Sequence, residues 1–308
     1  MKTTTSKPSN KPYVHKERCR SNEEWRAKRA ISIGASAVPT ILGVNPFKTP
    51  ADLVKLMRDE LLGIFVYDET FAQTRGHAYE GGVADMFSKY SGHKIIADSA
   101  AEYIVWRDDL SFLHASPDRI YWLDNNGPQK GTPAEDNKGV LECKTTRTSI
   151  DPDRMPLYWY LQLQTQMGIT GYHSGAIACD QLHKAKQDAF VFDFFSFDED
   201  LFKFIVEKCR IFWNDSILGN RKPANNLPEL QTSFPHLFDD KTKKKLSLFQ
   251  RLRRNKEVIE CLTPRSVQVI KQQPDVSARH QDNATVSLPE VDDDNDDNKS
   301  SWIERIWK

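Results

Sequence analysis

Two short strand patterns constrain the fold of this chain most, because each holds charged side chains within an apolar run. The first covers residues 112–122 and contains a single acid, Asp118. The second covers residues 139–146 and contains Glu142 and Lys144 two positions apart. Successive side chains of a strand face opposite sides of a sheet, so Glu142 and Lys144 are predicted to share one face. If the two strands pair, Asp118 stands beside them.

Two carboxylates and a lysine on paired strands are the groups that can hold a hard divalent cation beside a scissile phosphate. The same spacing also arises by chance in a chain in which 28% of the residues are charged. Among four such acid and lysine pairs, only Glu142 and Lys144 lie within a strand pattern. Because the solvent face of a strand carries charges routinely, this pair alone leaves both interpretations open.

A long helix is predicted over residues 71–90, and it places one further acid near the core. Apolar residues follow Glu80 at spacings of three, four and seven, so Glu80 lies on or beside the apolar stripe. A carboxylate turned toward a core is costly unless a cation or hydrogen bonds meet it. The alternative, in which Glu80 lies at the edge of the stripe and reaches water, stays open.

Predicted helices also place two uncharged polar residues. In the helix over residues 156–169, Gln164 shares a face with apolar residues, whereas Gln162 falls on a neighbouring face. A glutamine on an apolar stripe is more often a hydrogen-bonded core amide than a ligand. Ser36 is expected to cap a short helix that has Pro39 in its first turn.

Composition divides the chain into three parts. Residues 1–24 are polar and basic, and we expect a flexible segment. Residues 25–222 have the apolar periodicity of one compact α/β domain, and residues 223–308 form a polar, largely irregular tail. The tail contains eight basic residues within 241–256 and six acids within 290–297. Its end carries two tryptophans, which could dock to a partner or back onto the folded domain. The alternatives are a tail end without a role and a last helix that packs permanently.

Charge and cysteine content exclude some classes of protein. Lysine plus arginine equals aspartate plus glutamate at 43 each, so net charge does not indicate a nucleic-acid partner. The five cysteines form no C-x-x-C pair, which disfavours a zinc or iron–sulfur site and favours a reducing compartment. No apolar run approaches a membrane span. We therefore expect a cytoplasmic protein, or a nuclear one in a eukaryotic host.

Five motifs occur in an order that resembles the YqaJ-type viral recombinase family. They lie at 34–50, Arg75–Glu80, Ser116–Asp118, Leu141–Lys144 and Gln162–Gln164. This family is similar to phage lambda exonuclease within the PD-(D/E)XK nuclease superfamily, and the resemblance covers roughly Trp25 to Asn220. It implies a restriction-endonuclease-like α/β core, in which helices flank a mixed central β-sheet.

The resemblance also implies roles for individual residues. Asp118, Glu142 and the backbone carbonyl of Cys143 would bind a metal ion, and Glu80 would face a second metal, directly or through water. Lys144 would be the catalytic lysine.

Three further positions complete the comparison with the family. Gln164 matches the glutamine that places the attacking water, and Arg29 and Ser36 match the pair that binds a 5′-phosphate. The chain departs from the family at Arg119, where a glycine is usual after the motif aspartate.

The function implied is a Mg²⁺-dependent 5′-to-3′ exonuclease acting on linear double-stranded DNA in viral or mobile-element recombination, with Mn²⁺ able to substitute. A single-strand annealing protein is the implied partner, and a ring-shaped trimer is the implied assembly. Two alternatives stay open. One is a site- or structure-specific endonuclease on the same fold, which would cut closed circular DNA. The other is an inactive DNA-binding adaptor, which the presence of the full residue set disfavours.

Overall fold

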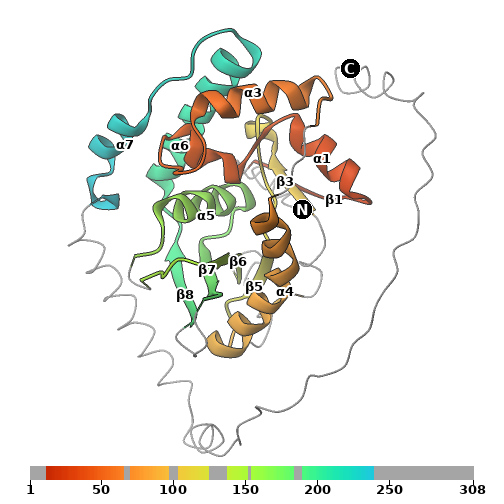
Figure 1. The fold of residues 1–308 in the computed structure, drawn as a ribbon, viewed down its shortest axis with the longest axis vertical. Helices are drawn as coiled ribbons and strands as arrows, with labels where there is room; N and C mark the ends of the chain where they lie inside the picture. Colours follow the sequence, from red (N-terminus) through yellow and green to blue (C-terminus); the bar gives the residue numbers. More distant parts are fainter. Residues whose placement is uncertain are drawn as a thin grey trace, which may run out of the picture. The chain divides into compact units, whose positions relative to one another are not determined.

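The computed structural model describes residues 12–65, 70–96, 103–124, 137–151, 154–183 and 189–238 (Figure 1). The strands are β1 (Val14–Arg18), β2 (Ile33–Gly34), β3 (Tyr103–Arg107), β4 (Leu113–Ala115), β5 (Arg119–Trp122), β6 (Lys138–Thr146), β7 (Ser174–Gln181) and β8 (Phe190–Ser196). The α-helices are α1 (Asn22–Ala30), α2 (Val38–Ile41), α3 (Pro50–Leu61), α4 (Phe71–Ser91), α5 (Leu157–Thr170), α6 (Glu199–Ile211) and α7 (Leu227–Ser233). Short helical turns are η1 (Ala35–Ala37), η3 (Asp108–Leu110), the π-helix η5 (Phe212–Leu218) and η6 (Pro235–Leu237).

The strands form two mixed four-stranded sheets. Sheet A has the order β1-β3-β4-β2, with β2 and β4 parallel and the other pairs antiparallel. Sheet B has the order β5-β6-β7-β8, with β6 and β7 parallel between two antiparallel pairs. The predicted α/β class with mixed sheets and flanking helices is confirmed, but the strands are divided between two sheets instead of one.

The first strand pattern of the sequence is in fact two strands that belong to different sheets. Residues 113–115 pair within sheet A, and residues 119–122 pair with β6 in sheet B. Pro117 lies between them, and proline has no N–H to donate to a strand ladder. The segment Ser116–Asp118 is therefore the crossing from one sheet to the other, and Asp118 lies at its end.

Two helices cover opposite faces of sheet B (Figure 1). On β6, Val140 packs in a cluster with Leu163 and Met167 of α5. The next residue, Leu141, packs in a cluster with Phe87 of α4. Strand alternation then places Glu142 and Lys144 on the α5 face, which leaves the Cys143 side chain on the α4 face.

The position of α5 depends on a close approach to α6. A Cβ atom built on Gly168 would lie 2.3 Å from the ring of Phe202, a distance that real contacts do not reach. Leu161 and Ile169 of α5 share the larger core with Leu201 and Ile205 of α6. Glycine is therefore required where the two helices meet, and this contact fixes the helix that faces Glu142.

The folded part extends beyond both predicted boundaries. The prediction of a flexible segment over residues 1–24 is wrong for its second half, because β1 pairs with β3 and Ser21 caps α1. At the other end, Leu230 of α7 is fully buried, and the Asn226 side chain donates to the carbonyl of Ile41. The basic segment, the acidic run and the terminal tryptophans lie outside the described residues.

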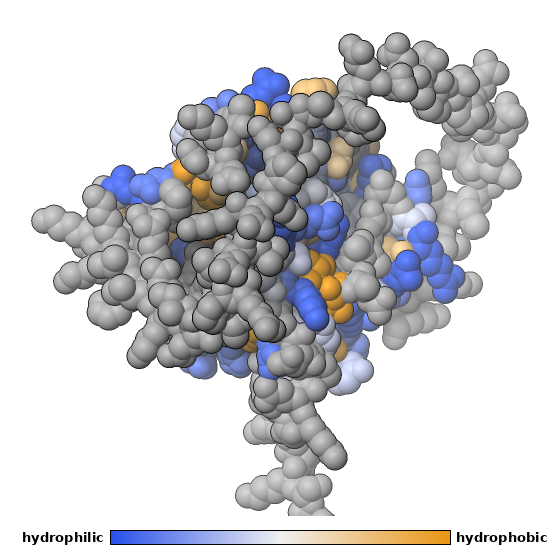
Figure 2. Space-filling view, turned by 90° about the horizontal axis from the view of Figure 1, so that it is seen from below, coloured by the Kyte–Doolittle hydropathy of each residue, from blue (hydrophilic) through white to orange (hydrophobic). Residues whose placement is uncertain are grey.

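The exterior carries no broad apolar face where Figure 2 shows described residues, because hydrophobic groups are small and lie between hydrophilic ones. No helix in the described ranges combines the length and apolar composition needed to cross a membrane. In the part of the chain that the structure describes, the cysteines at positions 19, 143, 179 and 209 are not joined by disulfide bonds. The compartment stays a prediction.

Candidate active site

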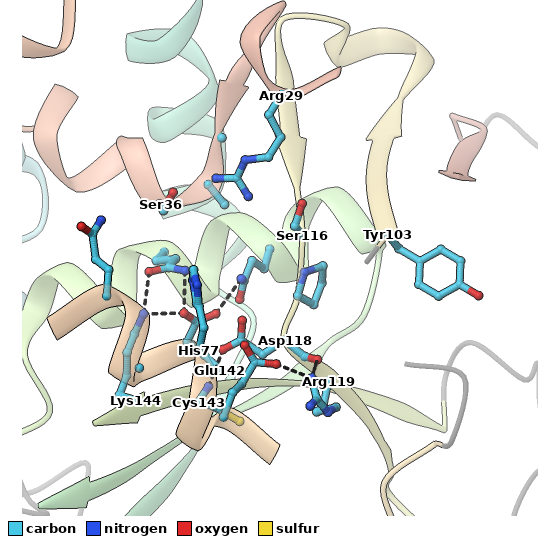
Figure 3. Close-up of a pocket in the computed structure, with 18 of the residues that line it drawn as sticks. Arg29, Ser36, His77, Tyr103, Ser116, Asp118, Arg119, Glu142, Cys143 and Lys144 are labelled. Atoms are coloured by element: carbon cyan, nitrogen blue, oxygen red, sulfur yellow. Dashed lines mark hydrogen bonds and ion pairs between the residues drawn. The ribbon is translucent and has the colours of Figure 1, made fainter. Parts of the chain in front are cut away.

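A cavity of about 700 Å³ opens where the chain passes from sheet A to sheet B. Its walls come from α1, η1, α4, the Ser116–Asp118 crossing, β6 and α5 (Figure 3). The residues from the sequence-based site that line it are Arg29, Ser36, Glu80, Asp118, Glu142, Cys143 and Lys144. Figure 3 shows Arg29 and Ser36 on one side of the cavity, with Asp118, Glu142 and Lys144 on the other.

A hydrogen bond joins Asp118 to β6. The backbone N–H of Cys143 donates to Oδ2 of Asp118 over 2.7 Å. The N–H and C=O groups of one strand residue point toward the same edge, so the carbonyl of Cys143 also faces this side. Burial, followed by the charges of Glu142 and Glu80, raises the pKa of Asp118 well above its usual value. The carboxylate thus lies where a cation would be favourable.

Glu142 and Lys144 meet as the strand period predicts. Nζ of Lys144 donates to Oε1 of Glu142 over 2.5 Å, and Glu142 is only 2% exposed. Burial lowers the pKa of Lys144, but the charges of Glu142 and Asp118 outweigh burial, so the pKa is raised. Lys144 is therefore a fixed positive charge at neutral pH and not a proton acceptor.

Two glutamines of α5 hold the other side of Glu142. Gln162 donates to Oε1 over 2.6 Å, and Gln166 donates to Oε2 over 2.7 Å. Oε1 of Gln162 also accepts from Lys144 over 3.2 Å. These residues lie four positions apart on the helix, and this spacing places them on one face.

The prediction for Gln164 is wrong in geometry. Its amide nitrogen donates to the carbonyl of Ser196, and its oxygen accepts from the N–H of Asp198. Gln164 is fully buried and does not line the cavity. Two helical residues correspond to about 200° of rotation, so Gln164 faces away from Gln162 and Gln166. Gln166 was missed, although its spacing from Gln162 was visible in the sequence.

Glu80 reaches the site from α4 and is met by a cation. Nη1 of Arg119 donates to Oε1 of Glu80 and to the backbone carbonyl of Asp118. The side chains of Arg119 and Glu80 are 14% and 25% exposed. The inward orientation of Glu80 that the sequence left open is thus the observed one, and its partner is the residue that follows Asp118.

The side of the cavity opposite the carboxylates is basic and hydroxyl-bearing. The guanidinium carbon of Arg29 lies 4.2 Å from the ring centroid of Trp25. Ser36 lies within η1, and α2 has Ala37 at its N-cap with no side-chain hydrogen bond. The expected helix cap by Ser36 is therefore wrong, and its exposed side chain borders the cavity instead.

A buried histidine supports this basic side. Nδ1 of His114 lies 2.7 Å from the hydroxyl of Ser32, and its Nε2 has no partner among the described residues. A Cβ on Gly34 would lie 3.1 Å from that Nε2, so glycine leaves room for the ring. Burial, followed by the charge of Arg29, holds the pKa of His114 well below its usual value. His114 is therefore neutral at physiological pH.

The fold resembles that of a known exonuclease. LHK-Exo in complex with dAMP gives a TM-score of 0.50 at 15% identity over 70% of this chain and 99% of that one. A second structure of LHK-Exo is that of an alkaline exonuclease from Laribacter hongkongensis. That structure gives 0.49 at 16% identity, with 70% and 99% coverage. At these identities the likeness concerns the fold alone.

Residues 24–173 match the YqaJ-like viral recombinase domain. The resemblance stated from the sequence motifs is thereby confirmed. A relative from Bacillus subtilis (strain 168), the uncharacterized protein YqaJ, is 28% identical over 211 residues. The match covers 66% of this chain and 59% of that protein, so less than two thirds of the relative is represented.

The buried His114 predicts a loss of stability in acid. Below about pH 6.5 the unfolded chain binds a proton that the native histidine does not, so the free energy of unfolding falls as pH falls. The contribution is about 1.4 kcal/mol per pH unit until the lowered native pKa is reached, and none arises above pH 6.5. Urea unfolding at pH 7.5 and 5.5 measures it.

His114→Gln should flatten this pH dependence, whereas His183→Gln, at an exposed site, should leave it unchanged. Equal pH slopes for the native protein and His114→Gln would show that His114 is not the group responsible.

Proposed function

We propose that this protein is a metal-dependent deoxyribonuclease that hydrolyses phosphodiester bonds, with Mg²⁺ as its ion and Mn²⁺ able to substitute. The observation that carries the proposal is the convergence of Asp118, Glu142 and Lys144 at one cavity, from two segments 24 positions apart. The match of residues 24–173 to the viral recombinase domain supports DNA as the substrate.

The donor atoms fit a hard cation. Asp118 uses one oxygen for the amide of Cys143, and three hydrogen bonds use three of the about four lone-pair sites of Glu142. In the described part of the chain, no group of three His, Cys, Asp or Glu side chains is arranged to coordinate a metal ion. Two carboxylates with the carbonyl of Cys143 are nevertheless sufficient, because Mg²⁺ retains several waters.

When bound there, the ion would acidify a water and neutralise charge on the scissile phosphate. Lys144 would hold that phosphate as a compact positive charge, because Glu142 and Asp118 keep it protonated. Gln162 and Gln166 would fix the orientation of Glu142, as outer hydrogen bonds do for metal ligands. The buried Oε1 of Gln166, which has no partner among the described residues, is an acceptor suited to the attacking water.

The basic side of the cavity supports exonuclease action in the 5′-to-3′ direction. Arg29 and Ser36 offer a guanidinium and a hydroxyl, which are donors suited to a terminal phosphate. An enzyme that holds a 5′-phosphate there, with its scissile bond at Asp118, would start at 5′ ends of linear duplex DNA. A role in DNA recombination, an annealing partner and a trimeric ring stay predictions.

The central test is digestion of end-labelled linear duplex DNA with Mg²⁺ or with a chelator. We expect degradation only with the metal, and none by Asp118→Ala or Lys144→Ala, both with native circular dichroism. Lys203→Ala, which removes an exposed lysine, should match the native protein. Cutting of closed circular DNA would indicate an endonuclease. Absence of cleavage with both Mg²⁺ and Mn²⁺ would reject the nuclease and favour an adaptor.

Arg29→Ala should reduce the preference for 5′-phosphorylated over 5′-hydroxyl ends by about tenfold or more, since a charge-assisted hydrogen bond contributes about 1.5–3 kcal/mol. Rates on the two kinds of end measure this preference. Lys28→Ala removes an equal charge from the same helix, where Lys28 bonds to Glu17 and Glu24, and should preserve it. A native enzyme indifferent to the phosphate would contradict the pocket.

Substitutions of Gln166 and Gln164 should have different effects, the first on the cleavage rate and the second on the stability of the fold. Gln166→Ala should slow cleavage by about 10–100-fold with little change in melting, because it releases Glu142. Gln164→Ala should cost about 1–3 kcal/mol of stability and leave the rate intact below melting, because it strands two backbone groups near α6. Single-turnover rates and urea titrations measure both. Slower cleavage by Gln164→Ala together with a native rate for Gln166→Ala would instead place Gln164 in the active site.

A further inference from the structure

We propose that Arg119 takes the place of a second metal ion in this site, so that each chain binds one catalytic divalent cation. This inference rests on the proposed nuclease function and names the metal requirement of the same site. It also gives a role to the arginine that follows Asp118.

The contacts of Arg119 are those that a second cation would need. Its Nη1 reaches the carboxylate of Glu80 and also lies 2.5 Å from the backbone carbonyl of Asp118. Both are oxygen donors of the kind that a hard metal ion binds. Figure 3 shows Arg119 beside Asp118, with these contacts drawn as dashed lines. The guanidinium therefore already occupies the space between α4 and the metal ligands.

The backbone directs Arg119 to this place. Ile120 packs in the cluster that contains α5 residues, whereas Tyr121 packs in the cluster that contains α4 residues. Arg119 alternates with Ile120, so it projects to the α4 face together with Tyr121. Tyr121 is fully buried, and its ring lies 5.3 Å from that of Phe87 on α4. This packing holds the start of β5 against α4, where Glu80 is found.

The number of carboxylates in the cavity also favours a single metal ion. Among the described residues that line the cavity, the only acids are Glu80, Asp118 and Glu142. Glu142 is surrounded by Lys144 and two glutamines, and Asp118 is bound to the amide of Cys143. A second ion would need Glu80, and Glu80 is held by Arg119.

Counting charges favours one ion. When all three carboxyl groups are ionised, as a bound cation requires, Glu80, Asp118 and Glu142 carry three negative charges. Arg119 and Lys144 carry two positive charges, which leaves a net charge of −1. One divalent cation brings this group to +1, which matches the single negative charge of a phosphodiester. Two cations beside Arg119 would bring the group to +3, and such an excess is unfavourable in a partly buried site. Without Arg119, two cations would give +2.

The test counts ions, with Mn²⁺ as the probe and the EPR signal of free Mn²⁺ as the readout. The full chain is used. Because the six acids within 290–297 are further oxygen donors for cations, each protein is compared with the same protein carrying Asp118→Asn. Asparagine keeps an acceptor for the Cys143 amide, so that variant should fold. The number of ions lost on Asp118→Asn is the number in the site.

We expect one Asp118-dependent Mn²⁺ ion in the native protein and in Glu80→Gln, and two in Arg119→Ala. The double variant Arg119→Ala with Glu80→Gln should return to one, because the second ion would be held between Glu80 and Asp118. Melting curves check that each variant is folded. If Arg119→Ala does not fold, the number of ions counted in the native protein still tests the proposal.

Two Asp118-dependent ions in the native protein, or one in folded Arg119→Ala, would overturn the role of Arg119 while leaving the nuclease proposal intact. No Asp118-dependent ion in any background would overturn both, because the metal site itself would be absent.

Discussion

The hydrogen bond between the Asp118 carboxylate and the Cys143 amide is the contact on which the site depends. It ties the end of the crossing between the two sheets to the middle of β6, whose alternating residues carry Glu142 and Lys144. Without it, the acid of the crossing and the acid and lysine of the strand would belong to separately placed segments. Burial of Asp118 near two other carboxylates is tolerated because this bond and the nearby lysine offset part of the cost.

Sequence reasoning located the groups whose positions follow from a short repeat. The period of two places Glu142 and Lys144 together, and helical spacing brings Glu80 inward. The same reasoning failed for Gln164, because a helical stripe shows which residues share a face and not which polar neighbour the face meets. Gln162 and Gln166 face β6, whereas Gln164 satisfies backbone groups before α6. Tertiary packing determines which partner each glutamine meets, and a local sequence pattern does not predict it.

In the fold, too, local sequence patterns predict some features, whereas others depend on contacts between distant segments. Helix and strand positions within the domain follow from apolar periodicity, but the split into two sheets at Pro117 required knowledge of strand partners. Residues 14–18 are mostly exposed and lack a strong pattern, yet they pair with β3 along their length. Likewise, Leu230 and Leu237 lie in a polar stretch and still join the core. Weak local signals become ordered where a neighbouring element supplies the missing hydrogen bonds or apolar surface.

The contact between Gly168 and the Phe202 ring has a consequence for how this site can vary. Gly168 lies two residues after Gln166, on the helix that orients Glu142. Its carbonyl accepts a hydrogen bond from Nη1 of Arg107 over 2.9 Å, and it does not line the cavity. Any larger residue there would push α5 away from α6 and carry both amides with it. The orientation of Glu142 is thus linked, through α5, to a contact between two helices that lies outside the cavity. A substitution at Gly168 would therefore be expected to disturb the site without removing any of its charged groups.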